Sequence, residues 1–353
     1  MTESGSSSAA EAQAKAQASG HAATRPVAVV LLGDVMTDLV ARLDGPLVAA
    51  SDSPARISVE GGGAAANTAS WLAGLGARAV LLGRVGHDAA GRAAADGLRA
   101  TGVETRFATD PDRPTGTVIV LVEPGGERTM VPDPGANAAL DERDLPTDAF
   151  VRGAHLHLSG YTLLRPGSRD AGLAALRLAR DAGMTASVDA ASVGPLKAVG
   201  ADRFLAWIDG VDVLFANRAE AVCLAETDSV RGEVGVGLDD DGDDDDDDDD
   251  DGDVRAAARV LSECCGLVVV KLGARGALGR TAGGAFERVD AVGLAPGAAV
   301  DTTGAGDAFA AGFLHAWLGH TPLRAALGAG CVLAARAVTS VGARQNTATT
   351  RTG

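Results

Sequence analysis

The residues best suited to chemistry lie near the carboxyl end of the chain, where residues 301–309 read Asp-Thr-Thr-Gly-Ala-Gly-Asp-Ala-Phe. The two glycines, Gly304 and Gly306, allow a sharp backbone turn just before a helical pattern begins. N–H groups in the first turn of a helix have no partner within the helix, and the helix dipole makes them attract anions. The segment therefore predicts an anion pocket at the start of this helix, of the kind that binds phosphate.

A carboxylate, Asp307, stands at the edge of this predicted pocket. Beside an anion site, a carboxylate has an evident use if it takes a proton from a hydroxyl that attacks a bound phosphate. An aspartate that simply caps the helix after a glycine turn is the alternative. The spacing alone leaves both interpretations open.

A second glycine-rich segment, residues 60–67, reads Glu-Gly-Gly-Gly-Ala-Ala-Ala-Asn and leads into another predicted helix. Its bare backbone permits the close approach of a ligand, and Asn67 offers both a donor and an acceptor. The glycines do not follow the first predicted strand directly, which excludes a dinucleotide-binding fingerprint. The sequence also lacks the glycine-rich, lysine-containing motif of P-loop nucleotidases.

Short apolar runs that alternate with helical patterns position these segments. Such alternation is typical of parallel strands with helices on both faces of the sheet. Two stretches lack intervening helices and alternate like antiparallel strands, which predicts a small projecting β lid from about residues 36–60 and 107–131. The predicted strands of the main sheet are 27–33, 79–83, 154–158, 185–189, 211–215 and 267–271, and the predicted helices are 65–75, 88–100, 168–182, 218–225, 254–264, 305–318 and 323–339.

Taken together, these segments resemble the PfkB (ribokinase-like) family of ATP-dependent sugar and nucleoside kinases, over roughly residues 26–344. The resemblance implies a three-layer α/β/α ribokinase-like sandwich with a mostly parallel central sheet and a small β lid, in one kinase domain of residues 26–343. The matching segments, in the family's order, are 33–38, Gly62-Gly63-x-x-x-Asn67, 82–88, Asn217-x-x-Glu220, 271–276 and 301–307.

At the matching positions, the resemblance implies that Asp307 is the general base toward a sugar hydroxyl. The backbone N–H groups of Gly304, Ala305 and Gly306 would bind the charge that develops on the transferred phosphoryl group. The sugar-binding positions correspond to Asp38, Gly62, Gly63 and Asn67, together with Asp307.

The resemblance also implies a nucleotide site that holds ATP. Asn217 and Glu220 match the family motif that positions Mg²⁺ and phosphate, with Glu220 acting largely through water. The same pair also reads as a helix capping box, and both interpretations can hold. The remaining ATP-binding positions are Lys271, Gly273, Gly276, Gly304 and Gly306, and Asp301 and Thr303 match the place where the family often binds a monovalent cation such as K⁺.

We therefore expect an ATP-dependent sugar kinase, an enzyme that transfers phosphate to an alcohol group. Ala64 and Met36 depart from the lysine and asparagine that ribokinases carry there, so ribose is not the evident acceptor. A nucleoside kinase of the same family is the alternative, although only Phe107 and Tyr161 are at hand to stack a base. A non-catalytic sugar-binding protein is a third interpretation, which the intact base and anion pocket disfavour.

Composition limits the partners of this 353-residue chain, which is 46% apolar. Thirteen of its acidic charges lie between Leu238 and Val254, so the rest of the chain accounts for only −3 of the net charge of −16. We expect no basic face for nucleic acid and no membrane span. We interpret the Asp-rich stretch, about residues 236–253, as a solvated disordered loop, with the alternative that it binds cations or a basic partner.

Four further expectations follow from the sequence. Residues 1–25 and 344–353 are predicted to be disordered tails. The four cysteines form no CxxC pair, which indicates a reduced compartment and a cytoplasmic protein. His155 and His157 alternate on a predicted strand, where packing is favoured over metal binding. Because a β lid exposes strand edges, we expect a homodimer that pairs the lids of two subunits.

Overall fold

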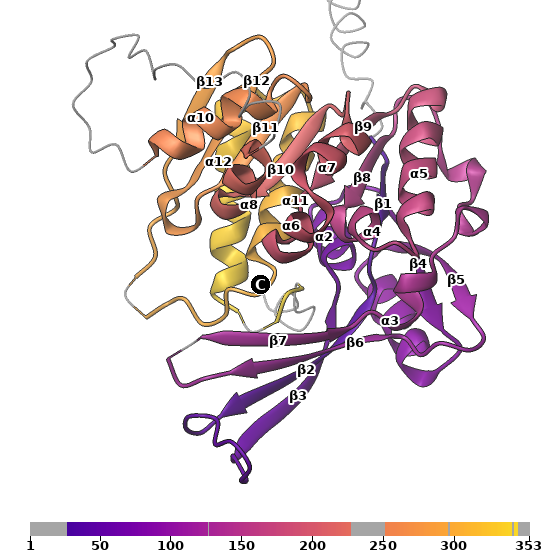
Figure 1. Ribbon diagram of the computed structural model, residues 1–353, viewed down its shortest axis with the longest axis vertical. Coiled ribbons are helices and arrows are strands. Elements are labelled where there is room, and N and C mark those ends of the chain that lie inside the picture. Colours follow the sequence, from indigo (N-terminus) through magenta and orange to yellow (C-terminus); the bar gives the residue numbers. More distant parts are fainter. Residues whose placement is uncertain (1–26, 126, 227–250, 296, 341, 345–353) are drawn as a thin grey trace, which may run out of the picture.

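The computed structural model describes residues 27–125, 127–226, 251–295, 297–340 and 342–344. The predicted tail of residues 1–25, most of the Asp-rich loop and the chain after residue 344 lie outside these residues. Within them the chain forms a large sheet covered by helices on both faces, with a second, smaller sheet projecting from one side (Figure 1). This arrangement confirms the predicted three-layer α/β/α architecture.

The described part of the main sheet has nine strands. The central neighbours run parallel, whereas two strands at one edge, β12 (Ala277–Thr281) and β13 (Phe286–Val289), are antiparallel additions that the sequence analysis did not predict. In spatial order the strands are β13 (Phe286–Val289), β12 (Ala277–Thr281), β11 (Leu267–Lys271), β10 (Val213–Asn217), β9 (Thr185–Asp189), β8 (His155–Ser159), β1 (Val29–Leu32), β4 (Ala79–Gly86) and β5 (Glu104–Asp110).

Each face of the sheet has its own hydrophobic core, because successive residues of a strand point to opposite faces. Along β1, Val29 and Leu31 face one core while Val30 and Leu32 face the other. The first core packs against α2 (Ala64–Gly74), α3 (Ala89–Ala100), α11 (Ala305–Leu318) and α12 (Leu323–Val338), and the second against α4 (Gly160–Leu164), α5 (Arg169–Ala182), α6 (Val193–Val199), α7 (Ala201–Ile208), α8 (Arg218–Ala225) and α10 (Gly252–Leu261). The described residues also form the short helical turns η1 (Gly135–Ala139), η2 (Glu142–Asp144), η3 (Thr147–Ala149) and η4 (Gly273–Arg275).

The second sheet is the predicted lid, and it projects below the sandwich in Figure 1. The prediction set the start of its second segment too early, at residue 107. Residues 104–110 form β5, which pairs in parallel with β4 at the edge of the main sheet, so the lid resumes only at Gly116. In spatial order its strands are β3 (Ala55–Gly62), β2 (Met36–Leu43), β6 (Gly116–Val122) and β7 (Arg128–Asp133).

The end of the Asp-rich stretch is ordered, contrary to its assignment to a disordered loop. Asp251 is buried, and its carboxylate lies 2.8 Å from Arg275 Nη1 and 3.1 Å from Arg288 Nε. These guanidinium groups supply the countercharge that a buried carboxylate needs. Asp251 thereby anchors the start of α10, and Asp253 lies in the first turn of that helix.

The two strand histidines pack inside the sheet, as expected. The rings of His155 and His157 are buried and lie 2.8 Å from the hydroxyls of Thr185 and Ser187 on the neighbouring strand β9. Burial lowers their pKa values, to about 3 and about 4, so both rings are neutral. In the part of the chain that the structure covers, no helix is long and apolar enough to cross a bilayer.

Candidate active site

The site lies where the parallel strands end. Asp189 ends β9, Asn217 ends β10 and Lys271 ends β11, with Asn217 and Lys271 directly paired across the two strands. Because parallel strands present their carboxyl ends at one edge of the sheet, these side chains gather there although they are far apart in the sequence. The amino end of α11 also reaches this edge, since a Cβ at Gly306 would lie 3.4 Å from Lys271 Nζ.

The turn into α11 depends on glycine. Gly304 precedes the helix with φ of 74°, a left-handed conformation that favours glycine. A Cβ at this position would also lie 2.7 Å from the backbone oxygen of Ala343. The Ala305 N–H donates to Thr302 O at 3.3 Å, whereas Gly306 follows in the first helical turn, where N–H groups have no acceptor within the helix.

The Asp307 carboxylate does not cap the helix, so the capping alternative is wrong. Gly304 occupies the cap position, and Asp307 lies three residues further on in the first turn. Its Oδ2 accepts a hydrogen bond from Asn67 Nδ2 at 2.8 Å, from the first turn of α2. The two glycine-rich segments singled out in the sequence therefore meet at this contact.

Burial raises the pKa of Asp307 to about 7. The hydrogen bond from Asn67 opposes this shift, the charge of Asp189 adds to it, and the positive charges of Lys271 and Arg344 oppose it. A carboxyl group with a pKa near neutral pH is half ionised under ordinary conditions. Such a group is well suited to accept a proton during catalysis.

Arg344 belongs to the site, although the sequence analysis assigned it to the disordered tail. Its Nε donates to Asn67 Oδ1 at 3.1 Å, and its Nη2 donates to Gly62 O at 2.6 Å. Burial lowers the pKa of Arg344 to about 10, while the charges of Asp38 and Asp307 oppose the shift. A guanidinium group can only donate, so this contact turns the Asn67 amide with its nitrogen toward Asp307. No sequence motif pointed to this residue.

Asp38 has an acceptor atom available for a ligand. Its Oδ1 is buried and meets no hydrogen-bond donor among the described residues. The carboxylate lies over Gly62, where any side chain would overlap it. Burial raises the pKa of Asp38 to about 6, with Arg344 opposing and Glu60 adding to the shift. A ligand hydroxyl would satisfy this acceptor, because buried polar atoms are normally hydrogen-bonded.

The backbone conformation and the close packing at residue 63 require glycine there. Gly63 precedes α2 with φ of 97°, and a Cβ there would overlap the backbone carbonyl of Asp34. The residue therefore lets α2 begin close to the end of β1, which carries Asn67 toward Asp307. Its predicted contact with a sugar stays a prediction.

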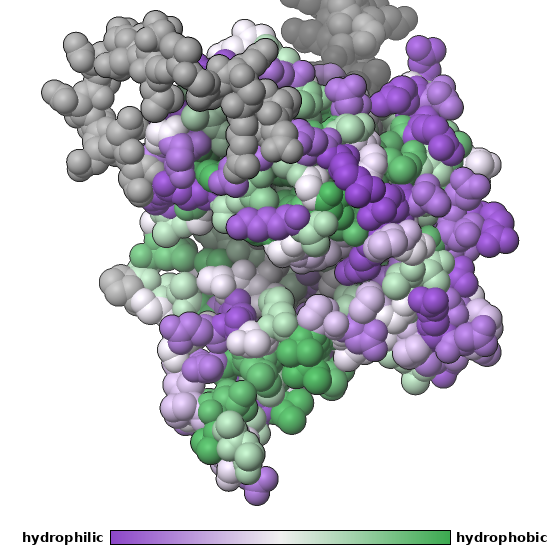
Figure 2. All heavy atoms as spheres, in the orientation of Figure 1, coloured by the Kyte–Doolittle hydropathy of each residue, from purple (hydrophilic) through white to green (hydrophobic). Residues whose placement is uncertain are grey.

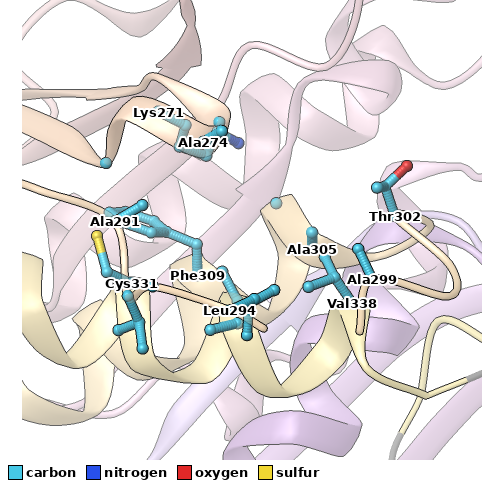
Figure 3. Close-up of a pocket in the computed structure, with 17 residues that line it drawn as sticks. Lys271, Ala274, Ala291, Leu294, Ala299, Thr302, Ala305, Phe309, Cys331 and Val338 are labelled. Carbon is cyan, nitrogen blue, oxygen red and sulfur yellow. The ribbon is translucent and has the colours of Figure 1, made fainter. Parts of the chain in front are cut away.

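A cavity of about 520 Å³ lies beside the turn of residues 301–306 that leads into α11, which we call the anion-hole turn after its predicted role, and most of the cavity surface is apolar (Figure 3). Six residues were predicted to bind the nucleotide. Two of them, Gly304 and Asn217, do not line the cavity, although Asn217 is paired with Lys271 on the adjacent strand. The other four, Lys271, Gly273, Gly276 and Gly306, line the cavity, and its apolar wall includes Leu294, Phe309, Cys331, Ala334 and Val338.

Charged pairs fill the strand ends next to this cavity. Lys271 Nζ lies 2.7 Å from Asp189 Oδ2, a site residue that the sequence analysis missed. Burial would lower the pKa of Lys271, but the charges of Asp189 and Glu220 outweigh it and hold the pKa above its usual value. Lysine here stays charged, as a group that meets a phosphate must.

Asn217 and Glu220 form the predicted capping box. Asn217 Oδ1 accepts from Glu220 N at 2.9 Å, and Glu220 Oε2 accepts from Asn217 N at 2.9 Å. No group of three or more His, Cys, Asp or Glu within the described residues could hold a metal by itself. The donors present fit Mg²⁺ that is held mainly by nucleotide phosphates and water, with Glu220 nearby.

The predicted monovalent cation site does not fit such an ion. Asp301 Oδ1 accepts from Thr303 N at 2.8 Å, and its Oδ2 accepts from Gly342 N at 3.2 Å. Each oxygen also faces an arginine of the lid, Arg128 or Arg42. The carboxylate is therefore already saturated by donors and positive charge from the chain itself.

Comparison with known proteins finds similar sugar and nucleoside kinases. An "ATP-dependent ribose-1-phosphate kinase" of Halopiger xanaduensis is 32% identical over 83% of this chain and 85% of its own. The "Fructokinase" of Salmonella typhimurium is 31% identical over 81% of this chain and 83% of its own. Among solved structures, an adenosine kinase from Sinorhizobium meliloti superposes with a TM-score of 0.76 at 27% identity, covering 90% of this chain and 96% of its own.

The sequence profile of the "pfkB family carbohydrate kinase" matches residues 28–350, which include every strand, the lid and the turn before Asp307. The chain therefore belongs to the pfkB family of carbohydrate kinases, phosphotransferases that act on an alcohol group.

Proposed function

We propose that this kinase transfers the γ-phosphoryl group of ATP to a hydroxyl of a small sugar, with Asp307 as the general base. The observation that carries the proposal is the position of the Asp307 carboxylate. It lies in the first turn of α11, beside the anion-hole turn, and is held by Asn67. Its pKa, raised to about 7 by burial, suits a base that works near neutral pH.

In the proposed step, a sugar hydroxyl gives its proton to an Asp307 oxygen as its own oxygen bonds to the γ-phosphorus. The bond between that phosphorus and the bridging oxygen breaks, and ADP leaves. The N–H groups of Gly304 and Gly306 are proposed to stabilise the negative charge on the transferred group. They are joined by that of Ala305 when it exchanges its long bond to Thr302 O for the phosphate. Donors held in place for a developing charge contribute several kcal/mol in comparable sites, roughly 2.7–4 kcal/mol each.

ATP is proposed to occupy the cavity lined by Lys271, Gly273, Gly276 and Gly306. Its largely apolar wall suits a purine ring, and the Lys271 ammonium suits the phosphates. Mg²⁺, when bound with ATP, would supply positive charge that neutralises the phosphates. Asn217 and Glu220 would orient its water ligands.

The acceptor is proposed to bind between the lid and the anion-hole turn. Asp38 Oδ1, which lacks a donor among the described residues, would accept from a sugar hydroxyl. Gly62, Gly63 and Asn67 would complete this subsite. The similarity to ribose-1-phosphate kinase and fructokinase makes a pentose, a ketohexose or their phosphates the first acceptors to test.

A nucleoside kinase is the second candidate, favoured by the similarity to an adenosine kinase structure. The nucleoside kinase candidate lacks an aromatic side chain that could stack on a base in the lid. Phe107 lies on β5 and packs into the core of the main sheet, so it is not part of the lid. Tyr161 packs against the Arg165 guanidinium, 5.1 Å from the ring centre. The four lid strands carry no aromatic side chain.

The test is Asp307→Asn, which keeps the size of the side chain and removes the base. ADP release is measured with Mg²⁺ and ATP against pentoses, ketohexoses, 2-keto-3-deoxy acids, sugar phosphates and nucleosides. We expect kcat to fall about 10³-fold for the best acceptor, the scale of general base catalysis. Binding of acceptor and ADP, measured by calorimetry, should change by no more than about threefold.

Asp170→Asn is the matched control, because Asp170 also lies in the first turn of a long helix, α5. This variant should keep the full rate. An Asp307→Asn enzyme with a near-normal rate would disprove the assignment of Asp307 as the base. A variant that is fully stable but no longer binds the acceptor would indicate that Asp307 binds the sugar instead.

The homodimer is proposed from the outer face of the lid, opposite Asp38. Leu39 pairs with both Val59 and Ile119 on this face, and Ile119 pairs with Val131. Val59, Ile119 and Val131 are 69%, 44% and 54% exposed, and Figure 2 shows an apolar patch over the lid. Exposed apolar sheet faces usually mark an interface, here with the lid of a second copy.

The cytoplasmic location stays a prediction.

A further inference from the structure

Two lid arginines converge on one buried carboxylate. Asp301, at the start of the anion-hole turn, is only 5% exposed. Arg128 Nη2, on β7, lies 2.6 Å from Asp301 Oδ1, and Arg128 Nη1 donates to Thr302 Oγ1 at 2.8 Å. Arg42 Nη2, on β2, lies 3.4 Å from Asp301 Oδ2. Arg128 is the more buried of the two arginines, with 13% of its side chain exposed against 29% for Arg42.

The surroundings of Asp301 keep it ionised. Burial would raise its pKa, but hydrogen bonds from Thr303 and Gly342 and the charge of Arg128 outweigh burial and hold the pKa below its usual value. A buried anion needs a positive partner. A carboxylate has about four lone-pair sites, and here each oxygen already meets one backbone N–H and one guanidinium.

We propose that Arg128 supplies, from within the chain, the positive charge that a monovalent cation would otherwise bring to Asp301, so that the enzyme works without K⁺ or Na⁺. Arg128 is a positioning residue, since it touches Asp301 and Thr302 and not the reacting atoms. Both of its partners lie in the turn that leads to Gly304. The inference rests on the proposed function in taking this turn as the anion hole.

The contact also connects two parts of the molecule. Arg128 is on the lid and its partners are on the turn before α11, 173 and 174 positions later in the chain. When the lid is in the position seen here, the same guanidinium neutralises Asp301 and holds the Thr302 hydroxyl. A free ion at Asp301 would neutralise this carboxylate whatever the position of the lid.

The experiment compares wild type, Arg128→Met, Arg128→Lys and the control Arg56→Met in tetramethylammonium chloride and in potassium chloride at equal ionic strength. Arg56 is an exposed arginine of the same lid, on β3. Two readouts are taken: the affinity for Mg²⁺-ADP by calorimetry, which needs no acceptor, and the rate of ADP release with the best acceptor.

We expect wild type, Arg128→Lys and Arg56→Met to differ by less than about twofold between the two salts. Arg128→Met should bind ADP at least fivefold more weakly in tetramethylammonium, and K⁺ should restore at least half of that loss. Fivefold or greater activation of wild type by K⁺ would overturn the proposal. So would an Arg128→Met variant that is unimpaired, or impaired with no response to K⁺.

The two readouts separate this inference from the proposed function. If no acceptor gave turnover in wild type, the kinase assignment to sugars would fail. The ADP affinities in the two salts would still decide whether Arg128 replaces a cation.

Discussion

Asp307, Asn67 and Arg344 form a short hydrogen-bonded chain, with Arg344 donating to Asn67 and Asn67 donating to Asp307. Other charges also face Asp307, namely Asp189 and Lys271, and Arg344 in turn faces Asp38. A general base must be ionised, so activity should rise as the pH rises through the Asp307 pKa of about 7. We expect the acid limb of kcat/KM in wild type near that value.

Replacing Arg344 by Met should move this limb upward. The positive charge of Arg344 lowers the pKa of Asp307. Without it, burial and the charge of Asp189 raise this pKa further. We expect a shift of about one pH unit to higher pH, since nearby opposite charges shift carboxyl groups by roughly 1–3 units. The measurement is the pH profile of kcat/KM, and Arg177→Met, an exposed arginine on α5, is the control.

A purely structural role for Arg344 would lower the rate at every pH without moving the limb. If the acid limb of Arg344→Met stayed at the wild-type pH, Arg344 would not control the pKa of Asp307. Arg344→Lys keeps the charge and should restore most of the original pH profile.

At the scale of an element, the start of α11 is determined by one glycine. Gly304→Ala would place a Cβ 2.7 Å from Ala343 O in a left-handed backbone conformation. The conformation costs about 1–2 kcal/mol and overpacking about 1–3 kcal/mol more. We expect the free energy of unfolding to fall by about 2–5 kcal/mol and kcat to fall at least 10²-fold, measured by denaturation and ADP release.

Gly284→Ala is the matched control for the helix start. Gly284 has φ of 86° in the connection between β12 and β13, and its nearest outside neighbour is 4.0 Å away. The Gly284→Ala variant should lose about 1–2 kcal/mol of stability and no activity. Equal effects of the two substitutions on kcat would argue against the anion hole at Gly304.

For the whole molecule, the outer lid face makes the assembly state testable. An Ile57→Asp substitution places a charge on a side chain that is 71% exposed on this face. If two lids bury their faces against each other, the buried charge should shift the protein toward monomer in sedimentation at micromolar concentration. Val332→Asp, at a position 51% exposed on α12, should leave the assembly unchanged. A wild-type monomer under these conditions would refute the lid dimer.

Much of the architecture was predictable from local patterns. Continuous apolar runs such as that in β11 and helical periodicity such as that in α5 are properties of neighbouring residues, which local sequence records. The edge strand β5, with its polar composition, has no such pattern, and the prediction placed part of it in the lid. Strands β12 and β13 were missed because glycine, threonine and charged residues interrupt them, so that neither shows a continuous apolar run.

By itself, the sequence determined the class of fold, the glycine turn into α11 and the acidic residue that follows it, because a turn, a helix start and their spacing are local. Only the tertiary structure decided which side chains surround Asp307. Arg344 reaches Asn67 across 277 positions, and Arg128 reaches Asp301 across 173. Such contacts arise when distant strands and loops pack together, and isolated arginines carry no local pattern that foretells them.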